Sequence, residues 1–165
     1  MVFMYISNCL EGRAPDMDIN DIAEIIETRI DGTLIEGVRN LNNNKEVIQA
    51  IPSLEFDVSL KPHSLSEIED EIKNHRPLIV WVELSDGHRK CPHAVVVTGF
   101  EKDDKHLIFY NDPIFGEQQE EIGAFMARWE RADRLLVKVK IGKREQRLLE
   151  EYIRKEKKEN KVDNL

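Results

Sequence analysis

The chain has 165 residues, of which 41% are hydrophobic and 34% charged, and its formal net charge at pH 7 is −8. This length and composition predict one folded domain with a core of its own. The acidic balance argues against a general nucleic-acid binder, no apolar run approaches the roughly 18 residues of a membrane span, and two cysteines are too few for a disulfide framework. We expect a cytoplasmic protein, because the apolar start MVFMYISNCL lacks the basic residues that open a secretory signal.

The first expected element is a buried helix over residues 2–10, in which Phe3, Ile6 and Leu10 recur at helical spacing. A buried helix usually follows a capping Ser, Thr, Asp or Asn, and no such residue precedes this one. We therefore interpret residues 2–10 as the remainder of a longer helix whose beginning is missing from the chain.

Two more helices are expected next along the chain. Asp18 can cap a helix over residues 18–30, which carries a stripe of isoleucines. Thr33 and Glu36 have the spacing of a capping box, which predicts a short helix over residues 33–42.

A polar connector, a strand and a fourth helix follow. Residues 42–52 are interpreted as the connector, and the alternation in FDVSL predicts a strand over residues 56–60. Ser64 and Glu67 form another capping box, which predicts a helix over residues 64–75.

From residue 78 onward, short runs rich in β-branched and aromatic residues predict strands over 78–84, 93–100, 106–111 and 135–141. A helix over residues 119–132 lies between the last two. Helices followed by an antiparallel sheet are typical of the α+β class. A charged final helix is expected over residues 143–160, so we divide the chain into a domain at 1–141 and a helical extension at 142–165.

The hairpin over residues 93–112 carries the candidate chemistry. If its turn is the four residues EKDD, facing residues have numbers that sum to 205, and His93 faces Asp112 with Cβ atoms about 4.5–5.5 Å apart. An aspartate beside a histidine can accept its Nδ1–H and stabilise the imidazolium, as the orienting group does in a nucleophilic site. The alternative is that Asp112 only opens a turn before Pro113.

The stretches RPLIVWVEL and HAVVVTGFEKDDKHLIFYNDP, followed by a helix with an F-x-x-x-W motif, are similar to the second half of the bacteriocin-leader-processing cysteine peptidases. The resemblance covers about residues 18–139, and it places the family histidine on His93 and the family aspartate on Asp112. It implies a papain-like α+β fold in which N-terminal helices pack on an antiparallel sheet. It also implies a peptide or protein substrate, with leader peptides that end in two glycines as the family's substrates.

The peptidases of this family carry their nucleophile next to a glycine at the start of a buried helix, with an oxyanion-hole glutamine a few residues earlier. This sequence has neither the Cys-Gly step nor that glutamine. Cys9 lies at the wrong end of the helix over 2–10, and Cys91 precedes His93 by two residues with Pro92 between them. We therefore expect the nucleophilic cysteine to be missing and the chain as it stands to lack peptidase activity.

No metal or cofactor is expected. His88, Cys91 and His93 lie close in the sequence, but their spacing matches no common zinc site and a fourth ligand would have to come from elsewhere. Three functions stay open: a cysteine peptidase without its nucleophile segment, a catalytically inactive peptide-binding module, and a structural protein that forms homo-oligomers through its charged C-terminal helix. No nucleic-acid or membrane partner is expected.

Overall fold

The computed structural model of the chain describes residues 17, 19–28, 34–84, 92–102, 106–148, 150, 151 and 154. Several of the sequence-based expectations fall outside these residues: the helix over 2–10, the caps at Asp18 and Thr33, both cysteines, and His88.

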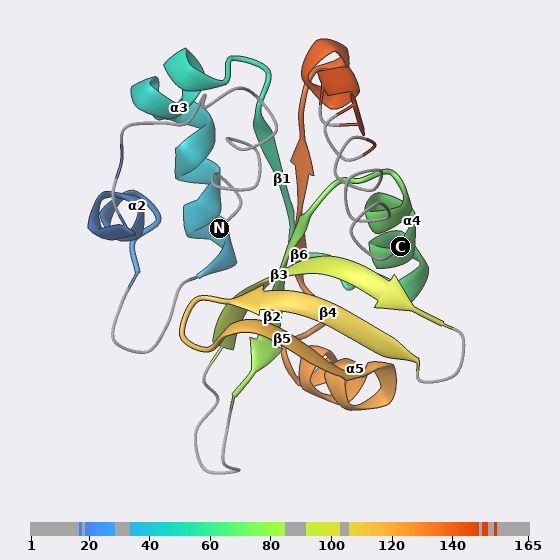
Figure 1. Ribbon diagram of the computed structural model, residues 1–165. Helices are drawn as coiled ribbons and strands as arrows, with labels where there is room; N and C mark the ends of the chain where they lie inside the picture. Colours follow the sequence, from blue (N-terminus) through green and yellow to red (C-terminus); the bar gives the residue numbers. More distant parts are fainter. Residues whose placement is uncertain are drawn as a thin grey trace.

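Six antiparallel strands form one sheet in the order β1-β6-β2-β3-β4-β5 (Figure 1). Their bounds are β1 Glu55–Ser59, β2 Leu78–Glu83, β3 Pro92–Glu101, β4 Leu107–Asp112, β5 Gly116–Glu121 and β6 Leu136–Lys140. The expected α+β class is confirmed, and all strands except β5 fall on expected runs. The sequence GEQQEE of β5 contains no apolar residue that could reveal a strand, and the helix expected from residue 119 begins only at Ile122.

The labelled helices of the described part are α2 Ile19–Ile25, the 3-10 helix η1 Ile35–Asn43, α3 Lys45–Ala50, α4 Leu65–Lys73 and α5 Ile122–Arg131. The helix expected over 18–30 is too long, because α2 ends at Ile25 and Glu27 has a φ of 55° that no α-helix continues through. The short helix expected over 33–42 is present as η1, with 3-10 rather than α geometry. None of the described helices is long and apolar enough to cross a bilayer.

The polar connector expected over residues 42–52 is wrong, because α3 lies within it. Asn44 caps this helix: its side-chain oxygen accepts the amides of Glu46 at 3.0 Å and Val47 at 3.1 Å. Val47 is buried and anchors the short helix to the core. A helix with so few apolar residues has no periodicity that the sequence could display.

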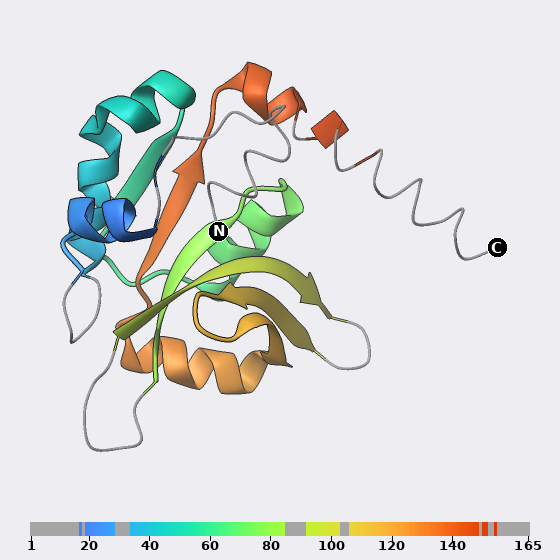
Figure 2. The ribbon, with the colours of Figure 1, turned by 60° about the vertical axis from the view of Figure 1, so that its left-hand side comes forward.

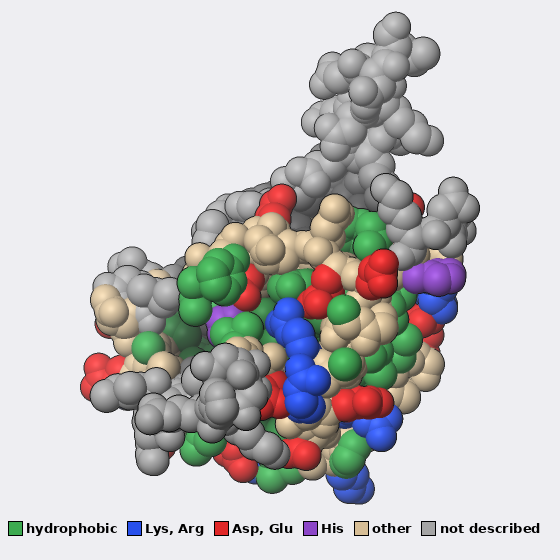
Figure 3. Space-filling model, turned by 90° about the horizontal axis from the view of Figure 1, so that it is seen from below, with side chains coloured by type: hydrophobic (Ala, Val, Ile, Leu, Met, Phe, Trp, Pro, Cys, Tyr) green, Lys and Arg blue, Asp and Glu red, His purple; other side chains and the backbone are tan. Residues whose placement is uncertain are grey.

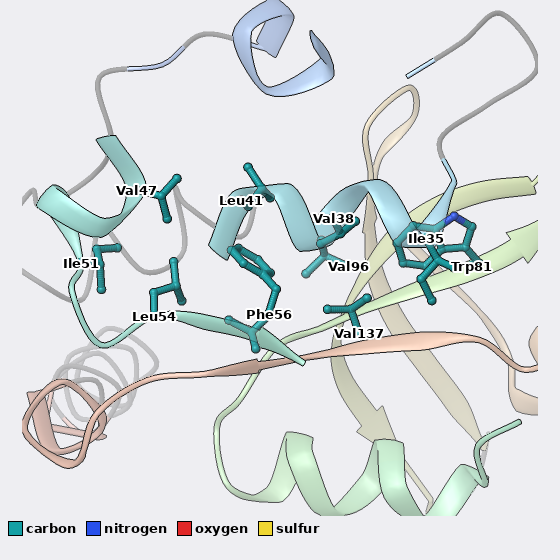
Figure 4. Close-up of a cluster of buried hydrophobic side chains, with 11 residues drawn as sticks. Ile35, Val38, Leu41, Val47, Ile51, Leu54, Phe56, Trp81, Val96 and Val137 are labelled. Atoms are coloured by element: carbon teal, nitrogen blue, oxygen red, sulfur yellow. The ribbon is translucent and has the colours of Figure 1, made fainter. Parts of the chain in front are cut away.

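The sheet is covered on both faces, and successive residues of a strand enter different cores. η1 and α3 cover one face, whereas α4 and α5 cover the other (Figures 1 and 2). On β2, Trp81 packs into the first core and Val80 into the second. The residues of the first core come from η1, from α3 and the residue after it, and from the strands β1, β2, β3 and β6 (Figure 4). They include Ile35, Val38, Leu41, Val47, Ile51, Phe56, Trp81, Val96 and Val137.

The start of the expected C-terminal helix is docked on the body of the domain. Residues 143–148 are helical, and the Gln146 side chain donates to the Asn74 carbonyl oxygen at 2.9 Å. Leu148 packs against the first core, and a Cβ added at Gly142 would lie 2.8 Å from the Ser53 Cβ. The chain therefore passes closely over the domain as it leaves β6.

Candidate active site

His93 and Asp112 come from neighbouring strands and meet at one end of the sheet. His93 is the second residue of β3 and pairs with Val82 of β2, and Asp112 is the last residue of β4. Because β3 and β4 are antiparallel, the start of one lies beside the end of the other. The His93 Nε2 and the Asp112 Oδ2 are 2.8 Å apart, and the two side chains are 11% and 3% exposed.

The register of this hairpin differs from the expected one. Near the turn, Glu101 faces Leu107 and Phe100 faces Ile108, so facing numbers sum to 208 rather than 205. The register then shifts by one residue between Val97 and Gly99, which leaves Thr98 as an extra residue in β3. The expected four-residue turn is therefore wrong, and the loop between the strands is longer.

The shift at Thr98 explains how the two side chains still meet. Beyond it Val96 faces Asn111, so continuing the register places Asp112 opposite Val95, two residues from His93 on the same face. Such diagonal neighbours lie about 7–8 Å apart at the backbone, within reach of a long side chain such as histidine. Without the extra residue, His93 and Asp112 would point to opposite faces of the sheet.

Asp112 uses its two carboxylate oxygens for different partners. Oδ2 contacts His93, whereas Oδ1 accepts the backbone amides of Ile114 at 2.7 Å and Phe115 at 3.1 Å. These two bonds close the turn that joins β4 to β5, and Gly116 completes the turn with a φ of 73°. The turn-opening role and the contact with His93 are thus compatible, and the turn aims Oδ2 at the imidazole.

The charge on Asp112 determines which nitrogen of His93 carries the proton. Burial raises the pKa of Asp112, but the two backbone amides and His93 outweigh it, and the pKa lies below its ordinary value of 3.8. An ionised carboxylate can only accept hydrogen bonds, so Nε2 must carry the proton that is shared with Asp112. The sequence-based expectation that Nδ1–H faces Asp112 is wrong, and Nδ1 is the nitrogen left for other chemistry. None of the described residues makes a hydrogen bond to it.

A second buried acid lies beside this end of β3. Glu83 is the last residue of β2, faces Pro92, and is 7% exposed. Its Oε2 lies 3.0 Å from Nε of Arg131, the last residue of α5. The ion pair fastens the end of α5 to the strand beside His93. Nothing in the sequence marks Glu83, because an acid at the end of an apolar strand is ordinary.

Within the described part of the chain, no group of three or more His, Cys, Asp or Glu side chains could hold a metal ion. Of the three residues weighed as zinc ligands in the sequence, only His93 lies in that part. The described part of the site contains an imidazole, a carboxylate and the turn that orients the carboxylate.

An imidazole held by a buried carboxylate at the end of an antiparallel sheet is the arrangement that the cysteine-peptidase resemblance implies. A family model described as the Peptidase_C39 like family matches residues 11–137, well over half of the chain. The chain belongs to this family. This C39-like domain is a cysteine-peptidase-like domain, and its α+β architecture is consistent with the papain-like fold. No curated protein and no solved structure matches it.

Proposed function

We propose that this C39-like domain binds peptides at the end of the sheet where His93 and Asp112 meet, with His93 as the base and Asp112 as its orienting group. The observation that carries the proposal is the 2.8 Å contact between Nε2 and Oδ2, which directs Nδ1 away from the carboxylate. A base of this kind needs a fixed tautomer and a partner that stabilises its charged form. Asp112 can supply both.

The chemistry that the pair supports is proton transfer to and from a cysteine peptidase's thiol. Nδ1 accepts the thiol proton, the thiolate attacks the peptide carbonyl carbon, and the ionised Asp112 stabilises the imidazolium. The same imidazolium then donates its proton to the leaving amine as the C–N bond breaks. The described residues provide the base and its support but not the sulfur.

We propose further that this chain does not supply the nucleophile. The reason is in the sequence: neither cysteine precedes a glycine, and no glutamine stands shortly before either of them. The chain as it stands should then bind peptides without hydrolysing them, unless a thiol comes from another source. A catalytically inactive peptide-binding module would show the same behaviour. The alternative from another class is a structural protein that forms homo-oligomers through its charged C-terminal helix.

Peptide binding and thiol reactivity can be tested separately on the full chain. We expect capped, fluorescein-labelled hexapeptide pools to bind in anisotropy titrations, and quenched-fluorescence versions of these pools to stay uncleaved under reducing conditions. Alkylation of Cys9 and Cys91 by iodoacetamide, followed by mass spectrometry, should proceed at the same rates in the wild type and in His93→Ala.

Each outcome bears on a different part of the proposal. Cleavage that disappears in Cys9→Ser or Cys91→Ser, or alkylation that slows in His93→Ala, would show that the chain carries its own nucleophile. Absence of binding to every pool would rule out peptide handling and leave the structural alternative.

A further inference from the structure

The two edges of the sheet differ in how their outward backbone groups are satisfied. β1 forms one edge and β5 the other. At β1, the Asn42 side chain of η1 accepts the Phe56 amide at 2.7 Å and donates to the Phe56 carbonyl oxygen at 2.9 Å, as a neighbouring strand would. Arg39 of the same helix donates to the Val58 carbonyl oxygen at 3.2 Å. The β1 edge is therefore closed by side chains of η1.

The β5 edge has no comparable cover in the described part of the chain. The Ile122 amide donates to the His106 carbonyl oxygen at 2.8 Å, and in an antiparallel ladder such bonds recur at every second residue, so the even-numbered residues of β5 face β4. Glu117 and Gln119 point their backbone groups outward. The Gln118 side chain donates to the Glu117 carbonyl oxygen at 2.8 Å. This leaves the Glu117 amide and both backbone groups of Gln119 without a hydrogen bond to a described residue.

The side chains along this edge are acidic. Glu117, Gln119 and Glu121 are exposed and lie on the face of β5 that is turned away from α5. Neither Glu117 nor Glu121 makes an ion pair with a described residue, whereas Glu120, on the other face, is paired with Arg128 of α5 at 2.9 Å. Seen from below, the molecule carries Lys and Arg side chains beside Asp and Glu side chains (Figure 3). Two carboxylates without a described cation are thus a local feature of β5.

The charges of this edge determine which strand can pair with it. A second copy of the chain paired through its own β5 would bring the same acidic side chains together, with Glu117 opposite Glu121 in the antiparallel register centred on Gln119. Like charges directly opposite each other destabilise a strand pair, whereas opposite charges stabilise it. An acidic edge also protects a sheet against non-specific pairing, so a strand that pairs here must bring compensating cations. The edge therefore favours an extended segment that carries Lys or Arg.

We propose that the β5 edge takes up an extended segment of a partner polypeptide as an additional strand, with Lys or Arg at two positions that have three residues between them. The backbone of the segment pairs with the Glu117 amide and with both backbone groups of Gln119, and its two cations face Glu117 and Glu121. The spacing follows from the two carboxylates, because every second residue of a strand lies on the same face. The inference goes beyond the proposed function, since β5 lies two strands from His93 of β3 and the pairing needs no proton transfer.

The charge requirement is tested with capped, fluorescein-labelled peptides Thr-X-Thr-Val-Thr-X-Thr, in which both X are Lys, Ser or Glu. In anisotropy titrations of the full chain at low salt, two cross-strand ion pairs should make the Lys peptide bind about tenfold tighter than the Ser peptide. The Glu peptide should bind most weakly. Glu117→Gln/Glu121→Gln should lose most of this preference. Glu55→Gln is the charge control, because Glu55 is an exposed acid of β1 at the opposite edge, and it should keep the preference.

The backbone pairing is tested at Gln119. Proline removes the outward amide of Gln119 but no bond of the ladder with β4, so Gln119→Pro should keep its melting temperature and bind the Lys peptide about tenfold more weakly. Gln119→Ala keeps the amide and should bind as the wild type does. Peptides test the same pairing without changing the protein: N-methylation of the central Val, whose N–H faces the Gln119 carbonyl oxygen, should weaken binding. N-methylation of the preceding Thr, whose N–H points away, should not.

The outcomes separate this inference from the proposed function. No binding of the Lys peptide, equal binding of the Lys, Ser and Glu peptides, or equal effects of the two N-methylations would overturn the inference alone. His93→Ala should bind the Lys peptide as the wild type does, and loss of binding in this variant would place the peptide at the His93–Asp112 pair instead of at β5. If the wild type sediments as a dimer that Gln119→Pro converts into a monomer, a second copy of the chain covers the edge and the inference is wrong.

Discussion

At the scale of single residues, Asp112 connects the turn to the imidazole. Its Oδ1 accepts two amides of the turn and its Oδ2 contacts His93, so one side chain stabilises a loop and orients an imidazole. Both contacts favour the ionised form, so each should weaken when the carboxylate is protonated.

The acid stability of the domain should therefore depend on Asp112. Its pKa is lower in the folded state than its ordinary value of 3.8, so the unfolded chain takes up the proton first as the pH falls. The carboxylate contributes stability above about pH 3.8 that is lost as the pH falls through the folded pKa. The free energy of unfolding, measured by urea denaturation at several acid pH values, should depend less on pH in Asp112→Asn than in the wild type. Parallel curves for the two proteins would contradict this.

Glu67 should make a second, smaller contribution of the same sign. The hydrogen bond from His63, the amide of Ser64 and the nearby Lys138 lower the pKa of Glu67 from 4.5 to about 2. Its stabilisation is present above pH 4.5 and should be lost between pH 4.5 and 2. We expect no more than about 1 kcal/mol, because the side chain is 38% exposed and solvent screens it.

Glu67→Gln tests this contribution, since glutamine can still complete the capping box with Ser64. Between pH 5 and pH 2 the free energy of unfolding should fall less steeply with falling pH for this variant than for the wild type. Glu101→Gln, at an exposed residue without an ion pair in the described part of the chain, serves as the control and should behave like the wild type. If the free energy of unfolding of Glu67→Gln depends on pH as that of the wild type does, the pKa of Glu67 is not lowered in the folded state.

At the scale of elements, a glycine sets how closely α2 packs on η1. A Cβ added at Gly37 would fall on the backbone carbonyl oxygen of Ile26, just after α2. Gly37→Ala should therefore destabilise the domain by about 1–3 kcal/mol, because backbone atoms cannot yield as a flexible side chain can. Gly123→Ala in α5 is the matched control. With nothing within 4 Å of the added atom, it should stabilise by about 0.4–1 kcal/mol. A melting temperature of Gly37→Ala above that of the wild type would contradict the close packing of α2 on η1.

The elements also show which features can be predicted from the sequence. The apolar runs of β2, β3, β4 and β6 each contribute buried residues to the two cores, so burial and sequence pattern agree and these strands are recognisable. β5 is not recognisable, because it has no apolar residue. α3 is not recognisable either, because it depends on the Asn44 cap and a single buried valine. A helix or strand can thus be predicted from the sequence when several of its residues are buried in a core.

The geometry of the His93–Asp112 contact could not be derived from the sequence. It depends on a longer turn and on the extra residue at Thr98, and neither has a sequence signature. The longer turn raises the sum of facing residue numbers from the expected 205 to 208, and the extra residue at Thr98 lowers it by one. The net change is an even number, which keeps His93 and Asp112 on one face of the sheet. Their proximity was anticipated, but in a register that is wrong, and the nitrogen that faces Asp112 is the other one.

At the scale of the whole molecule, the C-terminal extension can either stabilise the domain or join copies of it. Gln146 and Leu148 both contact the chain's own body, which favours the first role. Removal of residues 143–165 should lower the melting temperature without changing the mass measured by light scattering. A change from oligomer to monomer on removal would instead support the structural function proposed as an alternative.

The proposed chemistry depends on Asp112 holding His93 in the tautomer with the proton on Nε2. Long-range proton–nitrogen correlation spectra of the full chain labelled with 15N-histidine report this directly, at a pH where the ring is neutral. In the wild type we expect Nε2 protonated and Nδ1 bare. In Asp112→Asn, Oδ1 can keep the turn while the side-chain NH₂ faces Nε2, so the proton should move to Nδ1. A wild-type spectrum with the proton on Nδ1, or the same mixture of tautomers in both proteins, would contradict the proposed pair.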